Sequence, residues 1–136
     1  MISTINSTNP ASTSKAAFTL SMPNLLLRVE GLAFFIGAIA LYASQGFSGV
    51  AFVLLLLVPD VSMIGYLVNV TVGSRLYNVV HAYPLPLLLM AVGMAASAPV
   101  ALQIGLIWFA HISMDRVAGY GFKYATDFKD THLQRI

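Results

Sequence analysis

Four long apolar segments constrain the fold of this chain more than any other feature of its sequence. They run from about Asn24 to Ala43, from about Phe47 to Val58 with a helical extension past Pro59, from about Leu76 to Ala96, and from about Pro99 to Gly119. With its flanks, each has roughly the 20 residues that a helix needs to cross a hydrocarbon core of about 30 Å. Backbone groups in a bilayer must be paired within helices or closed barrels, and no ten-residue alternation typical of barrel strands occurs. The segments therefore predict membrane-spanning helices.

The composition excludes several other classes of protein. Only 9% of the residues are Asp, Glu, Lys or Arg and 58% are hydrophobic, whereas about 25% of a soluble domain is charged. A water-soluble monomer is therefore excluded. The chain has no cysteine, which excludes disulfides, cysteine-based zinc sites, iron–sulfur clusters and thiol chemistry. The net charge of +2 is small and the basic residues are scattered, which argues against a nucleic acid partner.

The connections between the segments predict how the helices are arranged. Residues 43–47 and 97–99 are too few for anything except tight antiparallel hairpins. We therefore expect an all-α fold, a four-transmembrane-helix antiparallel bundle over residues 24–120. Residues 1–23 are rich in Ser, Thr and Asn and are expected to form a flexible polar tail. Residues 121–136 are expected to form a cytoplasmic C-terminal tail.

The distribution of basic residues predicts the orientation in the membrane. If the helices alternate in direction, both termini lie on one face of the bundle, which we call the charged face. It carries all seven basic residues: Lys15, Arg28, Arg75, Arg116, Lys123, Lys129 and Arg135. The two short loops on the opposite side carry no charge, so the positive-inside rule places both termini in the cytoplasm and the protein in the inner membrane. The lipid bilayer is its expected partner, and a homo-oligomer is left open.

Five ionisable residues lie within or against the apolar segments: Glu30, Asp60, His81, His111 and Asp115. Such a residue in a membrane helix costs roughly 2.5 to 3.5 kcal/mol on insertion scales, so it indicates a functional site or a buried pair. The alternating topology brings all five to the charged face at a similar depth. We therefore expect them to form one polar cluster.

The spacing of four of these residues favours a metal site. Asp115 follows His111 by four residues, so both side chains project from one helix face. Asp60 and His81 from the neighbouring hairpin would complete a set of two nitrogen and two oxygen ligands, typical of zinc, with manganese or iron as alternatives. Without a metal, the same residues can form an intrahelical pair, a helix cap, ion pairs with nearby arginines, or a proton-coupled network.

Several nearby residues add smaller expectations. Pro59 favours a kink that turns the Asp60 carboxylate inward. Pro84 and Pro86 free carbonyls one turn earlier, next to His81. His132 is expected either to fold back over the end of the bundle or to lie exposed in the tail.

Motifs across the chain resemble a known family of small bacterial membrane proteins. The motifs near the C-terminus are His111-Ile-Ser-Met-Asp115-Arg116, Gly119-Tyr120-Gly121, Lys123-Tyr124 and Thr131-His132-Leu133. The earlier motifs are Arg28-Val-Glu30-Gly31, Pro59-Asp60 and Tyr77-Asn78 with His81. On these motifs, residues 24 to 133 resemble the domain of unknown function 4260. This resemblance implies no assigned activity.

A more distant resemblance suggests a chemistry. Pro59-Asp60, a His on the next helix, and the HxxxD pair together resemble inner-membrane metal-dependent hydrolases of the YdjM type and the zinc-dependent phospholipase C and P1 nuclease group. That resemblance implies a zinc site at Asp60, His81, His111 and Asp115. The further histidines of multi-zinc sites have no clear counterparts, because only Glu30 and His132 are left.

These observations lead to one leading hypothesis and its alternatives. The leading hypothesis is a metal-dependent hydrolase of a phosphoester or polar lipid group, in which Glu30 is the general base and Arg116 offsets phosphate charge. The alternatives are a small transporter or channel subunit, and an oligomeric structural protein whose polar cluster joins helices. A carboxylate-bridged redox centre would contain iron.

Overall fold

The computed structural model describes residues 20–126 and 130–136. Lys15, Lys129 and the expected tail as far as residue 19 lie outside these residues. Three helical runs are long and apolar enough to cross a membrane: Met22–Ser44, Gly49–Leu67 and Val70–Ala95. Apart from an isolated antiparallel bridge between Lys123 and Thr131, all regular structure in the described residues is helical. The predicted all-α class and membrane character are therefore confirmed.

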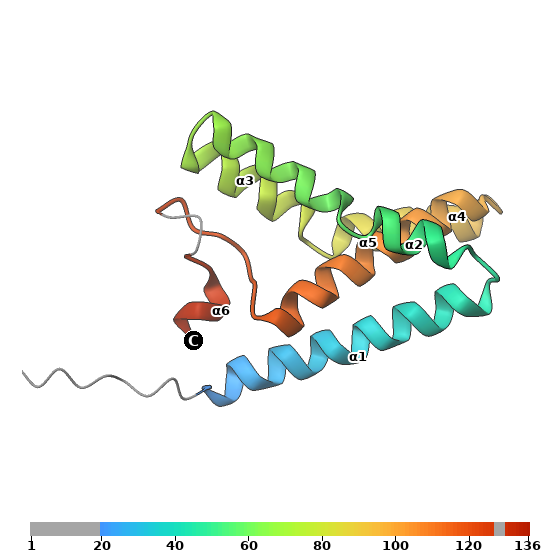
Figure 1. The fold of residues 1–136 in the computed structure, drawn as a ribbon, viewed down its shortest axis with the longest axis horizontal. Coiled ribbons are helices and arrows are strands. Elements are labelled where there is room, and N and C mark those ends of the chain that lie inside the picture. Colours follow the sequence, from blue (N-terminus) through green and yellow to red (C-terminus); the bar gives the residue numbers. More distant parts are fainter. Residues whose placement is uncertain (1–19, 127–129) are drawn as a thin grey trace, which may run out of the picture.

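The elements follow the predicted segments with two interruptions (Figure 1). Helix α1 covers Met22–Ser44, and the second run consists of α2 (Gly49–Leu55) and the 3-10 helix η1 (Val58–Leu67). The third run consists of α3 (Val70–Val80) and α4 (Pro84–Ala95). Helix α5 (Pro99–Ala118) and the short α6 (His132–Arg135) complete the described chain. Helix α5 carries five polar residues, Gln103, His111, Ser113, Asp115 and Arg116, and it is not among the three runs that are able to cross a membrane.

Helix α5 is the central element. It packs against α1 and against α4, while α3 packs against η1. Leu106, Ala110 and Ile112 of α5 are fully buried. In Figure 1 the start of α1, the turn between η1 and α3, and the end of α5 lie at one end of the molecule. The connections α1–α2 and α4–α5 lie at the other end. Successive helical runs therefore point in opposite directions, as the short loops predict.

The two interruptions have a common cause, the missing N–H of proline. Pro59 cannot continue the α-helical hydrogen bonds of α2, and Asp60 N instead donates to Leu57 O at 3.1 Å, the i to i+3 pattern of a 3-10 helix. The expectation of one continuous helix from Leu76 was wrong, because α3 ends at Val80 and Pro84 begins α4. Helix α3 also starts earlier than expected, at Val70, where the Asn69 side chain accepts from Val72 N at 2.8 Å.

Most of the surface of the three runs faces outward. Only 17%, 11% and 17% of the residues in their most apolar windows are buried inside the protein. The exposed residues include Leu26, Ile36, Leu54 and Ile64. A surface this apolar requires a bilayer rather than water.

The C-terminal segment, the described residues 121–126 and 130–136, packs against one end of the helices. Lys123, Thr131 and Leu133 are buried there. The Asn24 side chain of α1 donates to the carbonyl of Leu133, and Asn78 of α3 pairs with both backbone groups of Lys123, at 2.7 and 2.9 Å. The segment therefore forms a cover next to the last turns of α5.

Candidate metal centre

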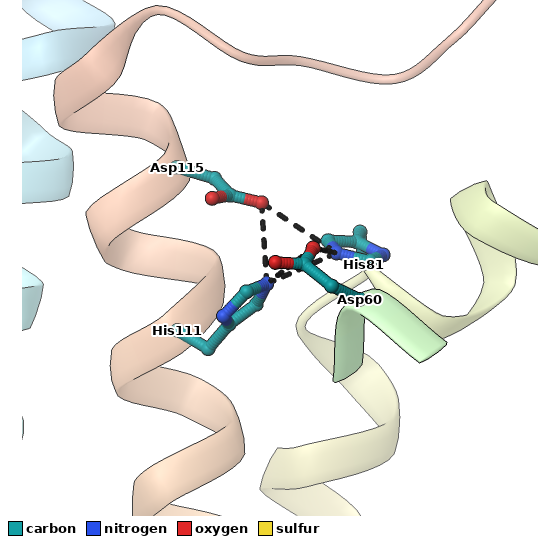
Figure 2. Close-up of side chains that lie close together, drawn as sticks. All are labelled: Asp60, His81, His111 and Asp115. Carbon is teal, nitrogen blue, oxygen red and sulfur yellow. Dashed lines mark hydrogen bonds and ion pairs between the residues drawn. The ribbon is translucent and has the colours of Figure 1, made fainter. Parts of the chain in front are cut away.

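Four ionisable side chains from three separate parts of the chain meet at one point (Figure 2). Asp60, His81, His111 and Asp115 each offer one ligand atom, and these atoms all lie within 4.8 Å of one another. The two histidine Nε2 atoms are 3.1 Å apart. The Oδ1 atom of Asp60 lies 3.5 Å from His81 Nε2 and 3.3 Å from His111 Nε2. The Oδ2 atom of Asp115 lies 3.5 and 3.4 Å from the same two nitrogens.

These separations fit a single four-coordinate cation. Ligand atoms about 2.0 to 2.2 Å from a tetrahedral zinc ion lie roughly 3.3 to 3.6 Å from each other. The five distances above fall between 3.1 and 3.5 Å. Five of the six separations are therefore those of a tetrahedral metal site, and the sixth, between the Asp60 and Asp115 oxygens, is within 4.8 Å. A divalent cation can be held there by two nitrogens and two oxygens.

Breaks in the helices position two of the four residues. Asp60 lies in the first turn of η1, directly after Pro59, so the change from α-helix to 3-10 helix sets the direction of its carboxylate. His81 is the C-cap of α3, in the break before Pro84. His111 and Asp115 lie one turn apart on the unbroken helix α5.

The ring of His81 is oriented by a hydrogen bond on its far side. Its Nδ1 lies 2.9 Å from the carbonyl oxygen of Tyr77, one turn earlier in α3. A carbonyl only accepts, so Nδ1 carries the proton and the neutral ring directs the Nε2 lone pair into the cluster. Metal-binding histidines are commonly held in this way, with the second ring nitrogen donating to a backbone carbonyl.

Tyr77 supports both sides of the cluster and is the functional residue that the sequence analysis missed. Its ring stacks on the imidazole of His81, and its hydroxyl donates to Asp115 Oδ2 at 3.2 Å. It is almost fully buried, at 1% exposure. The signal for it was present, because Tyr77 precedes His81 by four residues on a helix, the spacing that places two side chains on one face.

Three of the four side chains in the cluster are buried or nearly so, and the fourth is partly exposed. The side chains of His81 and His111 are fully buried and that of Asp115 is 12% exposed, whereas that of Asp60 is 36% exposed. His111 Nδ1 has no hydrogen bond of normal geometry, although the carbonyl of Leu56 lies close to it. Asp60 is therefore the most accessible of the four side chains.

Arg116 lies beside the cluster and is held in place by backbone carbonyls. Its guanidinium donates to Tyr120 O at 2.8 Å and to His81 O at 3.2 Å, and it lies over the ring of Phe122. The side chain is buried. Arg116 thus connects the break after α3, the end of α5 and the C-terminal segment.

The structure does not bring Glu30 into the group of four. Glu30 lies exposed on α1, although the next residue, Gly31, packs directly against Arg116. Arg75 is exposed on α3. His132 pairs with another residue of the C-terminal segment and not with the four ligands: its Nδ1 accepts from Phe122 N at 2.7 Å. The carbonyl of Val80, which Pro84 leaves without its helical donor, accepts from the Trp108 indole at 2.7 Å.

Comparison with known proteins identifies the family. The family model described as domain of unknown function 4260 matches residues 24–136, which include all four residues of the cluster. The chain therefore belongs to this family, as its motifs indicated. No curated protein and no solved structure matches the chain.

Proposed function

We propose that this membrane protein binds one divalent metal ion, preferably zinc, and uses it to hydrolyse a phosphoester or a related polar lipid group. The observation that carries the proposal is the set of four ligand atoms that all lie within 4.8 Å of one another, with each carboxylate oxygen 3.3 to 3.5 Å from both histidine nitrogens. Two lone pairs and two carboxylates facing one another in a buried site repel unless protons or a cation lie between them. Two histidines and two aspartates in a four-coordinate set favour zinc.

The exposure of Asp60 favours a catalytic site over a purely structural one. Catalytic zinc sites keep a position for water or substrate, whereas structural sites are closed and mostly contain cysteine. Here no cysteine is present, and four side chains would fill a tetrahedral set, so a bound water would take a fifth position on the side of Asp60, the ligand that is 36% exposed. A divalent ion in such a site supplies a bound water of lowered pKa and polarises the bond to be cleaved.

The remaining proposed roles belong to two residues of this chain. Arg116 keeps a positive charge next to the cluster, where it would offset the charge of a phosphate group. Glu30 is the proposed general base; it lies exposed on α1 next to Gly31, which packs against Arg116, and its carboxylate would have to turn toward the site to act. Both roles are tested by substitution, Arg116→Gln, which removes the charge, and Glu30→Gln, which removes the base.

We further propose that α1, α2 with η1, α3 with α4, and α5 form an antiparallel four-helix bundle in the inner membrane with both termini in the cytoplasm. The uncharged loops at one end and the arginines toward the other support this orientation. Because the natural chain has no cysteine, single substitutions report topology directly. We expect Gln134→Cys to react with a membrane-impermeant maleimide only in inverted vesicles, and Gln45→Cys only in intact spheroplasts. The opposite pattern would contradict the orientation.

The metal site is tested by measuring bound metal. The protein is purified in mild detergent and its metal content is measured by mass spectrometry, alongside His111→Ala and Asp60→Ala. Matched controls are His132→Ala and Asp130→Ala, which remove the same side chains outside the cluster. We expect about one metal per chain in the natural protein and the controls, and a loss in both cluster variants. A metal-free protein, or equal metal content in all five samples, would overturn the proposal.

Hydrolysis is tested separately with a chromogenic phosphodiester. The purified protein loaded with zinc should release the chromophore, and His111→Ala should not. Bound metal without hydrolysis of phosphodiesters or polar lipids would leave a structural metal site and refute the enzymatic part of the proposal.

A further inference from the structure

An apolar groove lies next to the candidate metal centre. It has a volume of about 570 Å³ and is lined by residues of α2, η1, α3 and α5, a size within the range of small-molecule sites, roughly 300 to 1,000 Å³. Most of its wall belongs to two of the runs that are able to cross a membrane. Its natural surroundings are therefore hydrocarbon rather than water.

The groove and the cluster share a wall. Pro59 and Val61, which line the groove, flank the ligand Asp60 in the chain. Val80, another lining residue, directly precedes the ligand His81. Trp108 lines the groove one turn before His111 on α5. The groove is thus lined by the same stretches of η1, α3 and α5 that carry the candidate metal ligands.

One polar group in the groove has no partner. Ser62 is 9% exposed and lines the groove, and its buried hydroxyl makes no hydrogen bond. A buried hydroxyl without a partner costs free energy, so such groups are normally paired. The indole N–H of Trp108 is already bonded to Val80 O. The Ser62 hydroxyl is buried, but it has no hydrogen bond to break when its side chain rotates to another χ1 rotamer toward a ligand in the groove.

We propose that the groove holds one hydrocarbon chain of a membrane lipid, and that the Ser62 hydroxyl donates to an oxygen of the linkage between this chain and the polar headgroup. The headgroup then lies at the cluster past Asp60. This last step rests on the proposed metal-dependent hydrolysis, whereas chain binding in the groove does not. The wall of the groove is apolar, as a lipid tail is. Its unpaired hydroxyl, that of Ser62, follows Asp60 by two residues, where the linkage of a bound lipid would lie.

The single tryptophan of the chain provides a direct measurement. Trp108 fluorescence is followed in detergent micelles during titration with phosphatidylcholine that carries a dibrominated acyl chain, because bromine quenches indole on contact. We expect saturable quenching. Ile64→Phe, which fills the groove from η1, should weaken the apparent affinity about tenfold or more. Ile39→Phe makes the same change on exposed α1, away from the groove, and should leave the affinity unchanged.

Ser62→Ala is the second variant, because it removes only the hydroxyl and does not crowd the groove. The loss of one hydrogen bond should weaken binding about two- to tenfold. Quenching that rises without saturation and is equal in Ile64→Phe and Ile39→Phe would show ordinary surrounding lipid and overturn the proposal. Quenching that is relieved as the protein self-associates would show a second copy in the groove and also overturn it.

The same titration with His111→Ala separates the two proposals. Saturable quenching that persists in this variant, whatever the metal content, supports the groove even if the metal site fails. Normal metal binding together with unsaturable quenching would support the proposed metal site and overturn the proposed lipid chain in the groove.

Discussion

Tyr77 stacks on His81 with ring centroids 3.7 Å apart and planes 12° apart. The same tyrosine donates its hydroxyl to Asp115 on α5 and accepts from the His81 ring through its backbone carbonyl. One buried residue thus orients two of the candidate metal ligands, the nitrogen of His81 and the carboxylate of Asp115. The two atoms that it positions lie 3.5 Å apart. A shift of Tyr77 would therefore change the distance between them.

Substitution of Tyr77 by phenylalanine should weaken metal binding without unfolding the protein. The change keeps the stacked ring and removes only the hydrogen bond to Asp115. Loss of such a supporting contact typically lowers metal affinity about 10- to 100-fold. Competition with a chromophoric chelator measures the affinity. Tyr124→Phe, which changes a tyrosine outside the cluster, is the control, and equal affinities in the two variants would show that the hydroxyl has no role.

The meeting of Asp60, His81, His111 and Asp115 could be predicted because two physical signals agree. Ionisable residues are costly in apolar segments, so the few that occur there are informative. Short loops force alternate directions, which places residues from segment ends at the same depth. Together these signals predicted the group that the structure brings within 4.8 Å.

The position of Glu30 could not be predicted in the same way. Helix α1 is apolar on nearly every side, with Leu26, Val29 and Leu32 all exposed, so hydropathy carries no information on which side faces the bundle. The start of α3 was missed for a related reason. Thr71, Ser74 and Arg75 interrupt the apolar pattern there, although Asn69 caps a regular helix.

The packing of the C-terminal segment could not be predicted from the pattern of apolar residues either. Its packing depends on specific pairs of polar groups, such as Asn78 with the backbone of Lys123, and on Leu133, which is fully buried. Such pairs depend on which distant segments meet, and no periodicity in the chain marks them.

Substitution of Gly31 by alanine should destabilise the contact between α1 and α5. A Cβ atom at this position would lie 2.7 Å from Arg116 Cβ and 3.0 Å from Ser113 O. Crowding of this kind costs about 1 to 3 kcal/mol, which exceeds the helix propensity gained by alanine, about 1 kcal/mol. Thermal unfolding in detergent, followed by helical circular dichroism, should show a lower midpoint.

Gly37→Ala is the matched control on the same helix. A Cβ atom there meets nothing within 4 Å, so the midpoint should stay the same or rise. Equal midpoints for the two variants would mean that α1 and α5 do not approach closely at Gly31.

The attachment of the C-terminal segment should weaken as the pH falls. Partial burial, with the nearby charge of Arg116, holds the pKa of His132 below its ordinary value, about 6.5. A lowered pKa means that the folded protein favours the neutral ring, whose Nδ1 accepts from Phe122 N. The stabilisation is therefore complete above about pH 6.5 and is lost as the pH falls below it. Hydrogen exchange should show a falling protection factor for the Phe122 amide.

Two observations isolate His132 as the cause. His132→Asn keeps an acceptor that does not titrate, so protection of the Phe122 amide should become independent of pH between about 5 and 8. Asp130 does not interfere, because hydrogen bonds from Arg135 and Thr126 lower its pKa to about 2. Unchanged pH dependence in His132→Asn would assign the effect to another group.

Substitution of Glu30 by glutamine should separate catalysis from metal binding. Glu30 is exposed on α1 and is not among the four ligands, so its removal should leave the metal content at its natural value. If Glu30 accepts the proton of the attacking water, kcat should fall about 10²- to 10⁴-fold, the usual contribution of a general base. Arg75→Gln removes an exposed charge on α3 and should change kcat little. Unchanged turnover in Glu30→Gln would exclude Glu30 as the base, while loss of metal would make it a supporting residue of the site.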